Sequence, residues 1–121
     1  MPKTVLIIDD DLGLQTVLSI ALKDSGYNVL FASDGEEGLR RIPAVQPDLV
    51  ISDVMMPQMD GVQVFEKVKE HLRGEGVPII LMTALGRKDW FADLEAEGAI
   101  ILQKPFEVDY LLSVIRMMLE E

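Results

Sequence analysis

The protein has 121 residues, 49% of them hydrophobic, so it is expected to form one domain with one core rather than a disordered segment. It contains no cysteine and no apolar run of membrane-spanning length, which excludes disulfides, argues against a membrane protein and favours a cytoplasmic location. The formal net charge of −10 argues against direct contact with nucleic acid or anionic lipid, whereas it suits an acidic metal site or a basic protein partner.

Short apolar runs alternate with longer amphipathic stretches along the whole chain. In chain order, the pattern predicts a strand over 5–8, a helix over 12–23, a strand over 28–32 and a helix over 35–42 that Pro43 ends. It then predicts a strand over 49–52, a helix over 61–72, a strand over 77–82, a helix over 87–97, a strand over 99–102 and a helix over 107–119. Five successive strand–helix units predict an α/β fold with a parallel sheet and helices on both faces.

Polar side chains suited to chemistry follow four of the five predicted strands. In open parallel sheets, functional groups collect at the carboxyl ends of the strands, beside the point where the strand order reverses. The residues at these positions are Asp9, Asp10 and Asp11 after the first strand, Ser52 and Asp53 at the third, Thr83 after the fourth and Lys104 after the fifth. The sequence therefore predicts one site built from carboxylates, a hydroxyl and an ammonium group.

The carboxylates of Asp9, Asp10 and Asp53 favour a divalent cation. Like charges at short range raise one another's pKa, and a bound cation removes that conflict. Mg²⁺ prefers oxygen ligands and commonly binds through one or two carboxylates plus a phosphate, and Mn²⁺ is a suitable substitute. Zinc is disfavoured because the chain has no cysteine and a single histidine.

Asp53 is the candidate nucleophile. A carboxylate beside a metal ion can attack phosphorus and form an aspartyl-phosphate. The transferred group carries its charge on oxygen atoms, so catalysis depends mainly on positioning and charge neutralisation. The ammonium group of Lys104 and the hydroxyl of Thr83 are suited to contact those oxygens.

Four motifs together resemble the receiver domains of two-component response regulators, the superfamily of the chemotaxis regulators. They are IIDDD (7–11), SDVMMPQMDG (52–61), MTA (82–84) and KPF (104–106), in the order of that family and nearly at its spacing. The resemblance implies a flavodoxin-like doubly wound (βα)5 three-layer sandwich, whose five-stranded parallel sheet has the order 2-1-3-4-5. It also implies one receiver domain over 1–121, with no output domain in the chain.

The resemblance assigns roles to the acidic residues. Asp53 is the implied phosphoacceptor. The implied ligands of Mg²⁺ are Asp9, Asp10, Asp53 and the main-chain carbonyl of Met55.

The remaining motifs have implied roles of the same kind. Thr83 is the switch hydroxyl, Lys104 contacts the phosphoryl group, and Lys104–Pro105 is a cis peptide bond. The implied donor is a phosphohistidine on a sensor histidine kinase or a histidine phosphotransfer protein. The domain is expected to catalyse its own phosphorylation and slow dephosphorylation, and to signal to an output domain or a downstream protein.

Two features depart from the family pattern. Ile101 stands where many receivers have an aromatic residue, and the stretch 98–104 is one residue shorter than usual. Both fall on the face of the fourth helix, fifth strand and fifth helix, through which the family signals. Surplus apolar residues there predict a partner or homodimer surface with Ile101, Trp90 and Met118. Of the adjacent rings of Trp90 and Phe91, one is expected to pack on the sheet and the other to be exposed.

Other interpretations stay open at this point. A nucleotide-binding flavodoxin-like or Rossmann-type domain would need a glycine-rich phosphate loop, but the first strand opens into three aspartates. A Mg²⁺-dependent phosphohydrolase would need a separate general acid and a substrate cap. A docking module without chemistry would not need this set of residues. Taken singly, Asp11 is an ordinary helix cap and Asp53 an ordinary turn residue.

Overall fold

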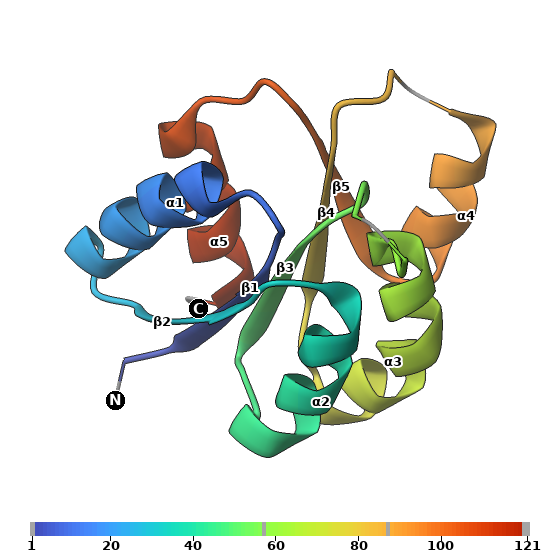
Figure 1. Cartoon of the computed structure of the whole chain (residues 1–121), viewed down its shortest axis with the longest axis horizontal. Helices are drawn as coiled ribbons and strands as arrows, with labels where there is room; N and C mark the ends of the chain where they lie inside the picture. The colour runs from blue at the N-terminus through green and yellow to red at the C-terminus, as the bar shows by residue number, and fades with distance from the viewer. Residues whose placement is uncertain (1, 57, 87, 120–121) are drawn as a thin grey trace.

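The computed structural model describes residues 2–56, 58–86 and 88–119, in which strands and helices alternate (Figure 1). The strands are β1 (Thr4–Ile8), β2 (Asn28–Ala32), β3 (Leu49–Asp53), β4 (Ile79–Thr83) and β5 (Ala99–Gln103). The helices are α1 (Leu12–Asp24), α2 (Gly35–Val45), α3 (Gly61–Glu75), α4 (Asp89–Ala96) and α5 (Val108–Leu119). All strands pair in parallel in the order β2-β1-β3-β4-β5, which confirms the predicted doubly wound sheet.

The sheet is buried between two apolar layers. Alternate residues of a strand point to opposite faces, so β1 places Leu6 and Ile8 in one core and Val5 and Ile7 in the other. The first core includes side chains of α2, α3 and α4, and the second includes side chains of α1 and α5 (Figure 1). None of the helices in the described ranges reaches the combined length and hydropathy of a membrane span.

The prediction that Pro43 ends the second helix is wrong, because α2 continues to Val45. A proline lacks the N–H donor of a helical residue, and near the end of a helix this loss affects only the last turn. The helix ends at Gln46, which has a left-handed conformation (φ 49°) and donates its N–H to the Ile42 carbonyl over 3.1 Å.

Other boundaries differ from the prediction by a few residues. Strands β3 and β4 include Asp53 and Thr83 as their last residues, so the backbone of both lies within the hydrogen-bonded sheet. Helix α3 extends beyond the predicted end at residue 72, because the left-handed cap that closes it is Gly76 (φ 69°). Helix α4 begins at Asp89, and the predicted start at Arg87 lies outside the described residues.

Candidate functional site

The carboxyl ends of β1 and β3 bring three aspartates together. One oxygen from each carboxylate of Asp9, Asp10 and Asp53 lies within 4.8 Å of the other two. Asp9 is fully buried and Asp53 is 6% exposed, whereas Asp10 is open to solvent. The register pairs Ile8 with Ser52, so the next residues, Asp9 and Asp53, lie beside each other at the point where the strand order reverses.

One carboxylate oxygen of Asp9 is hydrogen-bonded and the other is not. Oδ1 accepts a hydrogen bond of 2.9 Å from the Asp11 N–H, while Oδ2 is buried and has no donor among the described residues. The pKa of Asp9 is raised to about 6, chiefly by burial; the Asp11 N–H opposes this rise, and the negative charge of Asp53 adds to it. A hard cation would give Oδ2 a partner and offset the repulsion, so these residues fit Mg²⁺.

Asp53 is paired with a cation of the chain itself. Lys104 Nζ lies 3.2 Å from Asp53 Oδ2, and Asp53 Oδ1 accepts a hydrogen bond of 3.4 Å from the Met55 N–H. The start of α3 packs closely against this strand end: a Cβ on Gly61 would lie 2.3 Å from the carbonyl oxygen of Asp53. Glycine is therefore required at position 61 for the helix to approach the backbone of Asp53.

Thr83 is fully buried at the end of β4, the strand between β3 and β5. Its Oγ1 accepts a hydrogen bond of 3.0 Å from the Leu85 N–H, and its carbonyl accepts one of 2.7 Å from the Lys104 N–H. A hydroxyl that accepts one hydrogen bond keeps its own proton to donate. The predicted cis peptide bond between Lys104 and Pro105 is confirmed.

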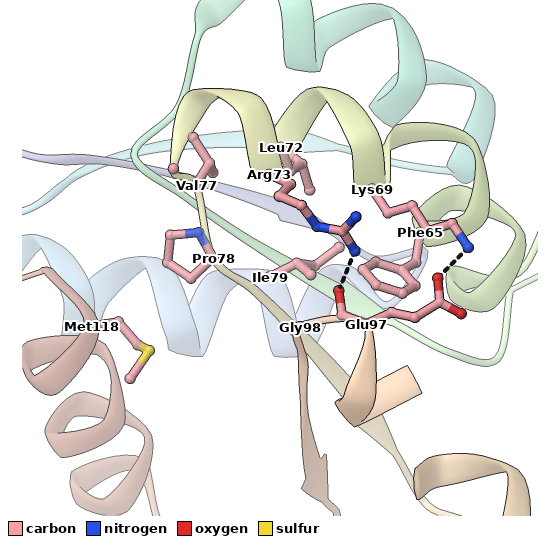
Figure 2. Close-up of a pocket in the computed structure, with 11 residues that line it drawn as sticks. Phe65, Lys69, Leu72, Arg73, Val77, Pro78, Ile79, Glu97, Gly98 and Met118 are labelled. Atoms are coloured by element: carbon pink, nitrogen blue, oxygen red, sulfur yellow. Dashed lines mark hydrogen bonds and ion pairs between the residues drawn. The ribbon is translucent and has the colours of Figure 1, made fainter. Parts of the chain in front are cut away.

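The residues predicted on the partner face lie in different environments. Trp90 is 39% exposed, and its ring packs edge-on against the fully buried Phe91 with the centroids 4.6 Å apart, so one of these two rings is buried and the other is partly exposed. Ile101 is half-buried and packs against the core of α2, α3 and α4. Met118 instead lines a cavity near the start of β5, together with Gly98 (Figure 2).

Gln15 belongs to the site although sequence reasoning did not select it. Its side chain is on α1, is 6% exposed, and donates Nε2–H to the carbonyl of Asp9 and, over 3.3 Å, to that of Ala32. The sequence feature that could have identified Gln15 is a polar residue on the apolar face of a helix, the face on which Leu18 and Leu22 are fully buried.

An open cavity of about 710 Å³ lies beside the aspartates, between α1 and the segment that follows β5. Lys104 contributes to both the cavity and the carboxylate cluster. The other walls are mainly apolar and include Leu14, Val17, Leu18, Phe106 and Val108. The cavity therefore reaches the site at Lys104, and most of its wall is apolar.

Known proteins share this sequence pattern. The response regulator receiver domain family matches residues 5–116. Over 98% of its length, the chain is 36% identical to the DNA-binding dual master transcriptional regulator RpaA of Synechocystis and 37% identical to the response regulator MprA of Mycolicibacterium vanbaalenii. The chain spans about half the length of these relatives, 49% and 51% respectively.

Solved structures share the fold. The chemotaxis protein CheY4 of Vibrio cholerae matches with a TM-score of 0.88 and 32% identity, over 98% of this chain and 100% of that chain. A chain of the CheX–CheY–BeF3–Mg²⁺ complex of Borrelia burgdorferi matches with a TM-score of 0.90 and 26% identity, over 100% and 92% of the two chains. Because the family matches residues 5–116, which is most of the chain, this protein belongs to the response regulator receiver domain family.

Proposed function

We propose that this receiver domain accepts a phosphoryl group on Asp53 and thereby changes its contacts with a partner. The observation that carries the proposal is the arrangement of charge around the end of β3. Asp53 lies 3.2 Å from the ammonium group of Lys104 and, within 4.8 Å, has carboxylate oxygens of Asp9 and Asp10. Such a cluster supports a carboxylate nucleophile that works between a cation of the chain and a bound metal ion.

The ligands of the metal ion would be Asp9, Asp10, Asp53 and the main-chain carbonyl of Met55. The buried Asp9 Oδ2, which has no donor among the described residues, supports this assignment. Receiver domains generally depend on Mg²⁺, and the related Borrelia burgdorferi complex contains Mg²⁺ with BeF3. When bound, Mg²⁺ supplies positive charge that neutralises the phosphoryl oxygens, and Mn²⁺ is expected to replace it.

In the transfer step, an oxygen of Asp53 forms a bond to phosphorus while the bond between phosphorus and the donor's histidine nitrogen breaks. The electron pair of the broken bond stays on that imidazole. Lys104 pairs with one phosphoryl oxygen, and the hydroxyl of Thr83 donates a hydrogen bond to another. Hydrolysis of the aspartyl-phosphate then returns the Asp53 carboxylate and releases inorganic phosphate.

The donor is a sensor histidine kinase or a histidine phosphotransfer protein, since receiver domains interact with histidine kinases. We expect the donor protein to approach Asp53 from the open cavity of about 710 Å³, because Lys104 lines this cavity and also contacts Asp53. The apolar surface of α1 extends beyond this cavity, with Leu12 69% exposed and Ile20 59% exposed. An apolar helical surface of the donor would cover these side chains and deliver its histidine to Asp53.

The output passes through the face of α4, β5 and α5, to a downstream protein, an output domain or a second copy of the chain. Movement of Thr83 and Lys104 toward the new charge would change the packing around Ile101 and Trp90. The relative RpaA binds DNA, but the charge of −10 supports a protein contact for this domain. Light scattering over a concentration series, with and without BeF3 and Mg²⁺, tests whether two copies of the chain associate. A monomer under all of these conditions would exclude the homodimer.

The test of the site is intact-mass analysis after incubation with acetyl phosphate, with and without Mg²⁺. We expect wild type to gain one phosphoryl group only when Mg²⁺ is present, and Asp53→Asn to gain none. The matched control is Asp24→Asn, which makes the same chemical change at an exposed carboxylate at the end of α1 and should be labelled like wild type.

Two results would contradict the proposal. Normal labelling of Asp53→Asn would show that another residue accepts the phosphoryl group. An unlabelled wild type that also fails to bind Mg²⁺ in calorimetry would leave a receiver fold that acts only by docking.

A further inference from the structure

Gln15 connects the ends of two strands. The backbone carbonyls of Asp9 and Ala32 lie where β1 and β2 end, and both accept a hydrogen bond from Nε2 of Gln15, the second over 3.3 Å. The Ala32 carbonyl also accepts the Asp9 N–H over 3.0 Å. The backbone of Asp9 is therefore held at its N–H and at its carbonyl, although the strand has already ended.

The same helical turn also holds the side chain of Asp9. The Asp11 N–H donates to Asp9 Oδ1 over 2.9 Å, and Asp11 caps α1 by accepting the Leu14 N–H over 3.1 Å. The Gln15 N–H donates to the Asp11 carbonyl over 3.0 Å. These contacts form a closed network of Asp9, Asp11 and Gln15, in which Asp9 Oδ2 is the carboxylate oxygen without a donor among the described residues.

We propose that Gln15 is a positioning residue that holds Asp9 and Asp10 in the geometry needed to bind a divalent cation. The inference rests on the proposed function, because it takes the acidic cluster as the cation site. Gln15 acts through the backbone of Asp9 and touches neither the cation nor the phosphoryl group. The three carboxylate oxygens lie within 4.8 Å of one another, and their negative charges repel. A backbone that is held in place prevents this repulsion from moving the ligands apart.

A structural role alone makes a different prediction. A buried carboxamide that only satisfies two carbonyls would affect the stability of the fold when removed, but not the affinity of the folded protein for a cation. The affinity for the metal, measured on folded protein, therefore separates a positioning residue from a structural one.

The experiment uses the full chain with Gln15→Met, which keeps the length of the side chain and removes its donors. Mn²⁺ and Mg²⁺ affinities are measured directly, by electron paramagnetic resonance and by calorimetry, at a temperature where urea unfolding shows each variant to be folded. We expect the Kd for both ions to rise about tenfold, the range seen when residues behind metal ligands are replaced. At saturating Mg²⁺, the rate of labelling by acetyl phosphate should return close to that of wild type.

Two further variants keep the test decisive. Gln15→Asn keeps an amide but is one methylene shorter, so it should also weaken cation binding, and it replaces Gln15→Met if that variant does not fold. Ser19→Ala changes another buried polar residue one turn further along α1 and should leave the Kd unchanged.

The outcomes also separate this inference from the proposed function. If wild type binds the cation and is labelled on Asp53 while both Gln15 variants bind equally well, only the role of Gln15 is overturned. If wild type binds no cation, the proposed function fails and the inference fails with it.

Discussion

Two clusters of charged residues lie at opposite ends of β4. At the carboxyl end of the strand, next to Thr83, three aspartates lie close together and one of them, Asp53, is paired with the ammonium group of Lys104. At the other end, a cavity of about 390 Å³ includes Ile79 at the start of the strand, and three charged residues line it (Figure 2). They are Lys69, Arg73 and Glu97.

The charges of the second cluster are matched. Lys69 lies 2.8 Å from Glu66 and also pairs with Glu97, and Arg73 pairs with Glu70 over 3.4 Å. Arg73 Nη2 also donates to the main-chain carbonyl of Glu97 over 3.2 Å (Figure 2). This second cluster therefore joins the C-terminal half of α3 to the end of α4 and has no charge that requires a ligand.

Raised pKa values have opposite meanings at the two ends. The pKa of Lys69 is raised by its hydrogen bonds to Glu66 and Glu97, which stabilise the charged form. The pKa of Asp9 is raised to about 6 mainly by burial, which destabilises the charged form. Unfavourable charge is thus concentrated at the end where a cation and a phosphoryl group are proposed to bind, and a cavity alone does not identify the functional site.

The largest expected difference between the two clusters is in phosphorylation rate. Lys104→Ala removes the ammonium group 3.2 Å from Asp53, so labelling by acetyl phosphate should still occur but about 10- to 100-fold more slowly. Lys69→Ala removes a lysine from the second cluster and should leave the rate within about twofold of wild type. Single-turnover labelling, followed by intact mass at saturating Mg²⁺, measures both.

A circular dichroism spectrum of each variant controls for loss of the fold. Equal rates for Lys104→Ala and wild type would show that the ion pair with Asp53 does not contribute to transfer. A slow Lys69→Ala variant would show instead that the two clusters are coupled.

The next expected effect concerns stability against pH without divalent cations. The folded pKa of Asp9 is about 6 against an ordinary value of 3.8, so the folded state binds more protons between these pH values. The stability that this carboxyl contributes is complete below pH 4 and is lost as pH rises through 6. Asp9→Asn should therefore gain about 1–3 kcal/mol relative to wild type between pH 4 and pH 7, measured by urea unfolding in EDTA.

Addition of Mg²⁺ provides the control for this prediction. At pH 7 the ion should stabilise wild type more than Asp9→Asn, because the variant has lost a carboxylate ligand. Unfolding curves whose difference is the same at pH 4 and pH 7 would contradict the assigned burial of a charged Asp9.

The fold was predictable because local pattern and topology agree. Buried strands such as β1 and β3 are short continuous apolar runs, and the helices between them have clear apolar faces. The end of α2 was not predictable from Pro43, because the energetic cost of proline depends on how many turns follow it. Here only the last turn is affected, and Gln46 closes the helix.

The acidic residues, the threonine and the lysine of the site were predictable because each stands at the end of a strand or just after it, and strand ends meet at one edge of a parallel sheet. Gln15 was not, because its importance depends on which backbone carbonyls lie opposite it across the fold. Likewise, the sequence pattern around Asp9 does not indicate which of its carboxylate oxygens has a donor, because that depends on the backbone geometry after β1.

The smallest expected effect is that of Glu97→Gln in the second cluster. The substitution removes the charge that pairs with Lys69, but the contact from Arg73 is to the main-chain carbonyl of Glu97 and remains. Because the side chains of Lys69 and Glu97 are partly exposed, the pair is screened by water, and Tm should fall by only about 1–3 °C, less at high salt. The labelling rate should not change.

This small effect is informative because Glu97 follows α4, the helix that carries Trp90. If the ion pair between Lys69 and Glu97 only stabilises the packing of α4 against α3, phosphorylation should change the fluorescence emission of Trp90 equally in wild type and in Glu97→Gln. A changed emission response in the variant, with an unchanged labelling rate, would mean that the ion pair sets how far α4 moves after Asp53 is phosphorylated. The cluster that looks purely structural would then control the output of the cluster that performs the chemistry.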